Sequence, residues 1–167
     1  MKLETLQELY VDLLKDMHSM ERQIIQALPK MIKAAENEQL STALSDHLEV
    51  TKSQLGRLDE IFNGLGKKGL GKKCKGMEGI LEEGKELLEK DADPSVLDAG
   101  ILAGAQHVEH YEMAGYGTAI AYARLLGDRN AVKLLEQSLE EEKKADADLT
   151  KLAESTVNLE AEVAASR

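Results

Sequence analysis

Apolar residues recur every three or four positions along most of the chain, which is the period of an amphipathic helix. The first two such runs extend over about residues 3–36 and 38–62. Two further runs with the same spacing cover about residues 94–126 and 128–156. The pattern therefore predicts four long helices and indicates an all-α protein.

Helix boundaries are marked by residues with known capping roles. Asp93 and Pro94 form a strong helix start, with Asp as the N-cap and Pro at the first helical position. Gly127 ends the third long helix and Asp128 caps the fourth. Pro29 lies inside the first helix and predicts a kink near its end.

The segment between the second and third long helices has a different character. Its first part, NGLGKKGLGKKCKG at residues 63–76, contains five glycines and five lysines and cannot form a stable helix. We expect a solubilising, mobile loop there. Residues 77–90 return to amphipathic spacing and predict a short helix.

These elements predict an antiparallel four-helix bundle. At about 1.5 Å per residue, helices of about 25 to 33 residues span roughly 38 to 50 Å, which is too long for a compact irregular fold. Short connections make the first two and the last two helices antiparallel neighbours. We expect the bundle over residues 1–156, with a long crossover at 63–93 that carries the short extra helix, and a frayed C-terminal tail at 157–167.

Composition narrows the functional classes. The 167 residues are 43% hydrophobic, enough for one domain with a buried core. The 21 basic and 31 acidic residues give a net charge of −10, which repels nucleic acids and anionic lipids. Cys74 is the single cysteine, and the sequence shows neither a secretory signal nor an apolar run long enough to cross a membrane. We expect a cytoplasmic protein that binds neither nucleic acid nor membrane.

Polar residues interrupt the apolar stripes near the middle of each long helix. Spacings of three and four residues place them on the same faces as neighbouring apolar residues. Antiparallel helices bring their midpoints into one layer, so these side chains are predicted to meet inside the bundle. They are Glu21, His47, Glu109, Glu112, Glu142 and Asp146.

Such a layer points to a metal site. Five carboxylates buried together would repel one another, and the desolvation of each would cost several kcal/mol unless it became protonated. A divalent cation removes this conflict, and oxygen-rich ligands with one or two imidazoles suit iron or manganese better than structural zinc. The alternative is that the acids are partly exposed or paired with Arg22, Lys52 or Lys143.

Four segments carry a family resemblance over nearly the whole chain. They are MERQ at 20–23, HLEVTKSQ at 47–54, VEHYEMAGYGT at 108–118 and LEEEKKADADL at 139–149. In these the chain resembles the YciE/YciF family of ferritin-like bundle proteins. The resemblance implies a homodimer with a di-iron or di-manganese centre that reacts with oxygen or peroxide in a bacterial stress response, such as a ferroxidase or a peroxidase.

The resemblance also implies roles for individual residues. Terminal ligands would be Glu21 and Glu109, bridging ligands Glu112 and Glu142, and neighbouring or terminal ligands His47 and Asp146. By their positions, two tyrosines that flank these ligands, Tyr111 and Tyr116, either are redox-active, donate hydrogen bonds to the ligands, or pack in the core with satisfied hydroxyls. We expect the other histidines, His18, His107 and His110, to be exposed.

The chain departs from the family pattern at two positions. Val50 stands where relatives usually carry Glu, and Ala145 stands where the usual pattern places a second ligand of the fourth helix. These departures motivate a second hypothesis, a metal-free helical scaffold or interaction protein whose site has degenerated. An iron-storage cage is a third hypothesis.

Overall fold

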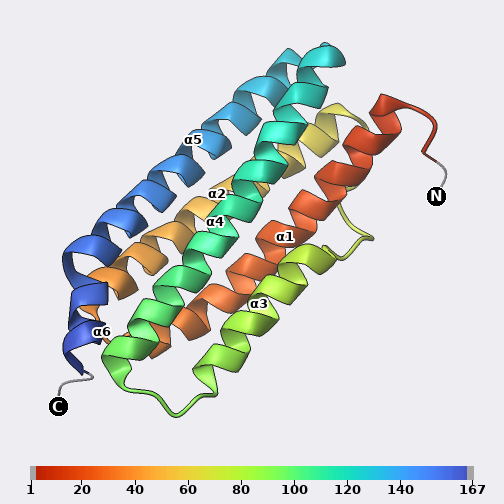
Figure 1. Cartoon of the computed structure of the whole chain (residues 1–167). Coiled ribbons are helices and arrows are strands. Elements are labelled where there is room, and N and C mark those ends of the chain that lie inside the picture. The colour runs from red at the N-terminus through yellow and green to blue at the C-terminus, as the bar shows by residue number, and fades with distance from the viewer. Residues whose placement is uncertain (1–2, 165–167) are drawn as a thin grey trace.

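Four long helices form an antiparallel bundle in a computed structural model that describes residues 3–164 (Figure 1). They are α1 (Leu6–Ala34), α2 (Glu38–Gly64), α4 (Pro94–Leu125) and α5 (Arg129–Leu152). Helix α1 packs against α2 and α4, and α5 packs against the same two helices, so α1 and α5 lie diagonally across the bundle. The described residues contain no strand, as the periodicity predicts.

Helix ends follow the capping chemistry of the sequence. Thr5 caps α1 in a reciprocal capping box with Glu8. Asp93 and Asp128 accept backbone hydrogen bonds at the starts of α4 and α5, as expected. The α1 helix continues through Pro29 as far as Ala34. The observed boundaries of the four long helices lie within a few residues of the predicted ones.

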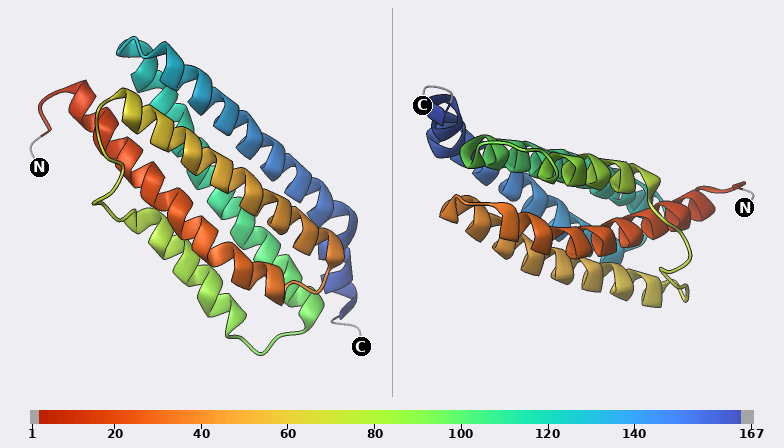
Figure 2. Two further views of the ribbon diagram at one scale, coloured as in Figure 1. Left: turned by 180° about the vertical axis from the view of Figure 1, so that it is seen from behind. Right: turned by 90° about the horizontal axis from the view of Figure 1, so that it is seen from below.

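The predicted crossover runs along the outside of the bundle. Its short helix α3 (Lys75–Leu88) packs against α1 and α4 (Figure 2). The glycine- and lysine-rich segment before it is fastened to α1, because Lys72 Nζ lies 2.5 Å from Asp12 Oδ2 and 2.6 Å from Asp16 Oδ2. The Cys74 backbone N–H also donates to Ser19 Oγ at 2.9 Å.

This segment covers a histidine that the sequence predicts to be exposed. His18 is only 5% exposed, its Nε2 lies 3.0 Å from Asp59 Oδ1, and its ring packs edge-on against Phe62. Gly69 lies directly above the ring, where a Cβ atom would come within 2.7 Å of it. The prediction for His18 is wrong because the helical wheel does not show a loop that folds back over α1.

The C-terminal region also differs from the prediction of a frayed tail over residues 157–167. After α5 the chain makes a π-helical turn (Ala153–Val157) and continues as α6 (Asn158–Ala164), which packs against α4. Ala153 and Val157 are buried. A π turn changes the face that the following residues present, so the apolar pattern of α5 does not continue in register. Residues 165–167 lie outside the described residues.

The interior of the bundle is filled by Leu, Ile, Met and aromatic side chains. The largest that are fully buried include Tyr10, Leu14, Met17, Ile24, Phe62 and Tyr116. Among residues 3–164, no helix is both long and apolar enough to span a membrane.

Asp98 on α4 fixes the turn between α1 and α2. It is buried, and its carboxylate accepts the backbone N–H groups of Glu36 at 3.0 Å and Asn37 at 2.7 Å. Asp98→Ala leaves both donors unpaired, so we expect the free energy of unfolding to fall by about 1 to 3 kcal/mol in urea denaturation. The control Val96→Ala, at a position 46% exposed on the same helix, should change it by less than about 0.5 kcal/mol. Equal stability of Asp98→Ala and the wild type would contradict this role.

Candidate metal centre

A group of four potential metal ligands lies at the centre of the bundle. His47 comes from α2, Glu109 and Glu112 from α4, and Glu142 from α5. One ligand atom from each residue lies within 4.8 Å of the others, and all four residues are buried. His47 Nε2 is 3.6 Å from Glu109 Oε1 and 3.8 Å from Glu112 Oε2. Four of the six predicted site residues are therefore brought together.

Glu21 adds a carboxyl from α1, so that all four helices contribute. Its side chain is fully buried and accepts a hydrogen bond from the Tyr116 hydroxyl. It interacts electrostatically with Glu112 and Glu142. Tyr116 thus acts on a predicted ligand as expected. The Tyr111 hydroxyl instead contacts Cys74 Sγ at 3.3 Å, on the side of α4 that faces the start of α3.

Burial dominates the electrostatics of these residues. It raises the pKa of Glu21 to about 8, although the Tyr116 hydrogen bond acts in the opposite direction. It raises the pKa of Glu109 to about 11, with a further contribution from Glu142, and that of Glu112 well above its ordinary value. Burial lowers the pKa of the His47 imidazole. Without a cation the carboxyls of Glu21, Glu109 and Glu112 therefore retain protons, whereas the His47 imidazole is neutral and can donate a lone pair.

Unpaired polar atoms concentrate in this layer. Among residues 3–164, eight buried side-chain nitrogen or oxygen atoms have no hydrogen-bond partner, and all but the Tyr10 hydroxyl belong to this layer. The seven atoms are Glu21 Oε2, His47 Nε2, Gln54 Oε1, Glu109 Oε2, Glu112 Oε1 and Oε2, and Glu142 Oε2. Buried polar atoms in native proteins are rarely unpaired. Carboxylate oxygens, an amide oxygen and an imidazole nitrogen are ligands for iron or manganese, so the donor set fits such an ion.

The basic residues that offered an alternative explanation do not neutralise the cluster. Lys52 pairs with Glu49 at 2.6 Å, and Lys143 pairs with Glu140 at 2.7 Å. Arg22 is exposed. None of these three basic residues therefore pairs with the buried acids. Arg57 is the basic residue that acts on Glu21, and it does so through its charge.

Asp146, a predicted site residue, is not a member of this group. Its Oδ1 accepts a hydrogen bond from Gln106 Nε2 at 3.1 Å and lies 3.2 Å from Nε2 of the exposed His110. Four helical residues turn by about 400°, so Asp146 is displaced by about 40° from Glu142 around α5. This rotation directs it toward the edge of α4. Glu142 is the one α5 residue in the group.

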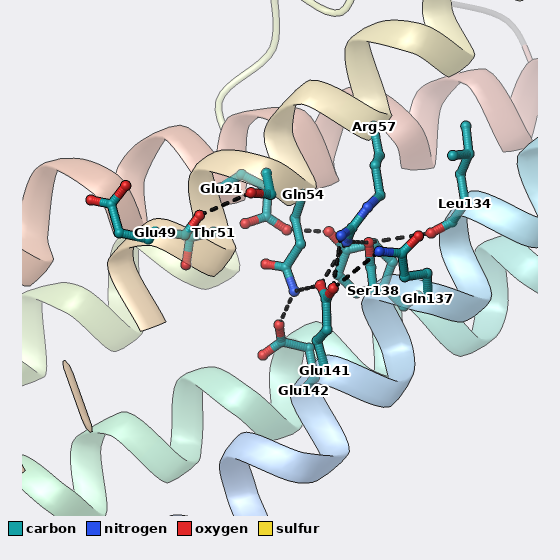
Figure 3. A network of polar contacts seen from close by, with 12 residues as sticks. Glu21, Glu49, Thr51, Gln54, Arg57, Leu134, Gln137, Ser138, Glu141 and Glu142 are labelled. Atoms are coloured by element: carbon teal, nitrogen blue, oxygen red, sulfur yellow. Dashed lines mark hydrogen bonds and ion pairs between the residues drawn. The ribbon is translucent and has the colours of Figure 1, made fainter. Parts of the chain in front are cut away.

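Gln54 and Arg57 form a supporting network that sequence reasoning missed. Figure 3 shows both side chains reaching from α2 toward α5. Gln54 Nε2 donates to Glu142 and, at 3.3 Å, to Glu141 Oε2. Arg57 binds both oxygens of Glu141 at 2.6 and 2.7 Å. The network fixes the orientation of Glu142. The spacing of Gln54, two helical turns after His47, is the signal that could have revealed it.

Val50 and Ala145, the two positions expected from the sequence to depart from the family pattern, face one pocket. Val50 on α2 and Ala145 on α5 line a pocket of about 260 Å³ that also reaches His47 and Glu109. Glu49, the neighbouring acid on α2, is exposed and pairs with Lys52. The valine and the alanine thus contribute space and apolar surface next to the buried cluster.

The metal-free protein is expected to lose stability as pH rises from about 5 to about 8. Glu21 keeps its proton in the folded protein up to about pH 8, whereas the unfolded chain releases it near the ordinary pKa of 4.5. The folded state therefore binds more protons, and the free energy of unfolding falls with pH by up to about 1.4 kcal/mol per pH unit for each such group.

Urea denaturation of chelator-treated protein at several pH values measures this slope. Glu21→Gln should give a shallower slope than the wild type. Glu49→Gln, an exposed change in α2, should leave the slope unchanged. Identical slopes for Glu21→Gln and the wild type would show that Glu21 does not hold an extra proton in the fold.

Comparison with known proteins identifies relatives of the same length and fold. Residues 5–162 match the model of a domain of unknown function, DUF892. Protein YciF of Escherichia coli K12 is 43% identical over 163 residues, which cover 97% of this chain and 98% of YciF.

Solved structures agree with this result. The crystal structure of the E. coli stress protein YciF superposes with a TM-score of 0.90 over 93% of this chain and 99% of that one, at 43% identity. YcfI of Rhodopseudomonas palustris, for which a structural role has been suggested, gives a TM-score of 0.87 at 45% identity over 89% and 95% of the two chains. The family match and the YciF identity, each over nearly the whole chain, show that this protein belongs to the DUF892 family.

Proposed function

We propose that the buried cluster binds two iron or manganese ions and that the protein is a ferritin-like redox protein of the bacterial stress response. The observation that carries this proposal is the set of seven potential ligand atoms in one layer of the bundle that have no hydrogen-bond partner. Repulsion between the buried acids disfavours their ionised state. A bound cation would stabilise that ionised state. The stress protein YciF, at 43% identity, supports the same functional setting.

The ligands in this proposal are Glu21, His47, Glu109, Glu112 and Glu142. A bound pair of ferrous ions would supply two electrons for the reduction of dioxygen or peroxide, as in a ferroxidase or peroxidase. The protein contributes the rest of the chemistry. The carboxyls of Glu21, Glu109 and Glu112, whose pKa values burial raises, would give up their protons when a cation binds, so metal uptake would release protons.

Two neighbouring side chains orient these ligands. The Tyr116 hydroxyl donates to Glu21, and Gln54 donates to Glu142. Both are fully buried, so water does not compete for these hydrogen bonds. Such supporting contacts set the direction of ligand lone pairs and limit the rearrangement that binding requires.

A metal-free scaffold is the second candidate function. Val50 and Ala145 favour it, because neither side chain can act as a ligand at positions where the family pattern carries one. The structural role suggested for YcfI points in the same direction. In that case Glu21, Glu109 and Glu112 would keep the protons that their raised pKa values favour. The homodimer that the resemblance implies is part of both proposals, whereas an iron-storage cage needs extensive assembly surfaces.

Metal content distinguishes these functions. Protein expressed with supplements of iron and manganese is expected to contain about two metal equivalents by elemental analysis, as in two-metal carboxylate sites. The double variant Glu21→Gln with Glu142→Gln should lose them, because one ligand from each of two helices is removed. Glu49→Gln, which changes an exposed acid, should retain them. At a free metal concentration of 100 times Kd, binding should add about 2.7 kcal/mol to the stability of the wild type.

The scaffold predicts a different result. Less than about a tenth of an equivalent, with no uptake after anaerobic addition of ferrous iron and no rise in Tm, would rule out a tight two-metal site. Equal metal content in the wild type and the double variant would place any bound metal elsewhere on the protein.

A further inference from the structure

A pocket between α2 and α5 reaches the buried cluster from the surface. Its volume is about 260 Å³, and His47 and Glu109 form its inner wall. The side walls are apolar and include Leu44 and Val50 from α2 and Leu149 from α5. Three other surface pockets, lined among others by Leu159, Lys85 and Arg22 respectively, contain no member of the cluster.

The same two residues also border a smaller space that extends toward α3. This inner void has a volume of about 30 Å³ and is lined chiefly by apolar side chains of α1, α2, α3 and α4, including Ile24, Leu44 and Val108, together with His47 and Glu109. Its lining residues Ala27, Met31 and Leu81 also line a surface pocket between α1 and α3. A void of this size holds a molecule of two heavy atoms, and an apolar lining disfavours water. The outer pocket, the His47 and Glu109 side chains, and the inner void are therefore adjacent.

The lining of the pocket between α2 and α5 favours uncharged molecules over ions. Its rim carries the acids Asp46, Glu141 and Asp148 and the base Lys144, which pairs with Asp148. Arg57 pairs with Glu141, so the rim keeps a small net negative charge that disfavours anions. The apolar walls impose a desolvation cost on any cation that passes between them, because they offer no replacement for its bound water. An uncharged molecule of two to a few heavy atoms avoids both costs.

We propose that this α2–α5 pocket is the route by which a small uncharged oxidant, dioxygen or hydrogen peroxide, reaches the buried cluster. The inference rests on the proposed metal centre, but it assigns a function to residues outside the ligand set. Val50 and Ala145 determine the width of the route, because each presents a small apolar side chain from an opposite wall. Metal ions are not expected to use it.

Two blocking variants and one matched control test the route. Val50→Phe and Ala145→Phe fill the pocket from opposite sides, so a folding defect in one does not prevent the test in the other. Ala147→Phe is the control, since Ala147 is exposed on α5 and does not line the pocket. Circular dichroism and Tm establish that each variant is folded.

The first readout does not depend on metal. Crystals of the metal-free protein pressurised with xenon, which occupies apolar cavities, should show xenon in contact with Leu44 in the wild type and in Ala147→Phe. Its occupancy should be strongly reduced in the two blocking variants. Xenon that is absent from the wild type, or that remains unchanged in both blocking variants, would overturn the proposed route.

The second readout is the oxidation of ferrous-loaded protein by hydrogen peroxide. Hydrogen peroxide takes two electrons from two ferrous ions and two protons from solvent, its O–O bond breaks, and two water molecules and two ferric ions result. The second-order rate constant should fall at least about tenfold in the blocking variants, because a 1.4 kcal/mol barrier at the route corresponds to that factor. A parallel experiment with dioxygen shows which oxidant is affected more.

Metal content separates failure of this proposal from failure of the metal centre. The blocking variants should load as much iron as the wild type. If the wild type loads no iron, the proposed function fails, and the xenon result still decides whether the pocket admits small apolar molecules. Wild-type oxidation rates in folded, iron-loaded blocking variants, or loss of iron uptake in them, would overturn the proposed route.

Discussion

The constraint on which this structure depends is the burial of four glutamates and a histidine in one layer of a helical bundle. Glu21, Glu112 and Glu142 have no exposed surface, and Glu109 is only 2% exposed. Burial raises the pKa values of Glu21, Glu109 and Glu112, so the charged layer opposes folding unless protons or a cation compensate for it. The hydrophobic core cluster around the layer supplies the stability that offsets the cost of burying these charged groups.

The surrounding polar residues are arranged to keep the layer in one conformation. Tyr116 and Gln54 each donate to one buried carboxyl, and Arg57 binds the neighbouring Glu141 on the solvent side. Several lone pairs nevertheless remain without donors. A purely structural network would satisfy them, because unpaired buried polar atoms are costly. The combination of oriented carboxyls and unpaired oxygen atoms is the observation that favours the proposed cation site.

The pocket between α2 and α5 relates the departures at Val50 and Ala145 to the same site. If they are regarded only as missing ligands, these residues favour a degenerate scaffold. Their position in the pocket suits them to a second role, because their small apolar side chains leave open a space that ends at His47 and Glu109. In the proposed function, Val50 and Ala145 therefore affect both the number of metal ligands and the access of small molecules to them.

Most of the architecture could be predicted from the sequence. Helical periodicity and the caps at Asp93 and Asp128 predict the long helices and their connections, because these features depend on neighbours within one or two turns. The same periodicity identifies Glu21, Glu109, Glu112 and Glu142 as inward-facing acids. Only the tertiary structure decided which side chains meet. Asp146 turns to Gln106, Gln54 joins Glu142, and the crossover buries His18. A helical wheel gives the direction of a side chain from its own axis, whereas its partners depend on the register, rotation and packing of other helices.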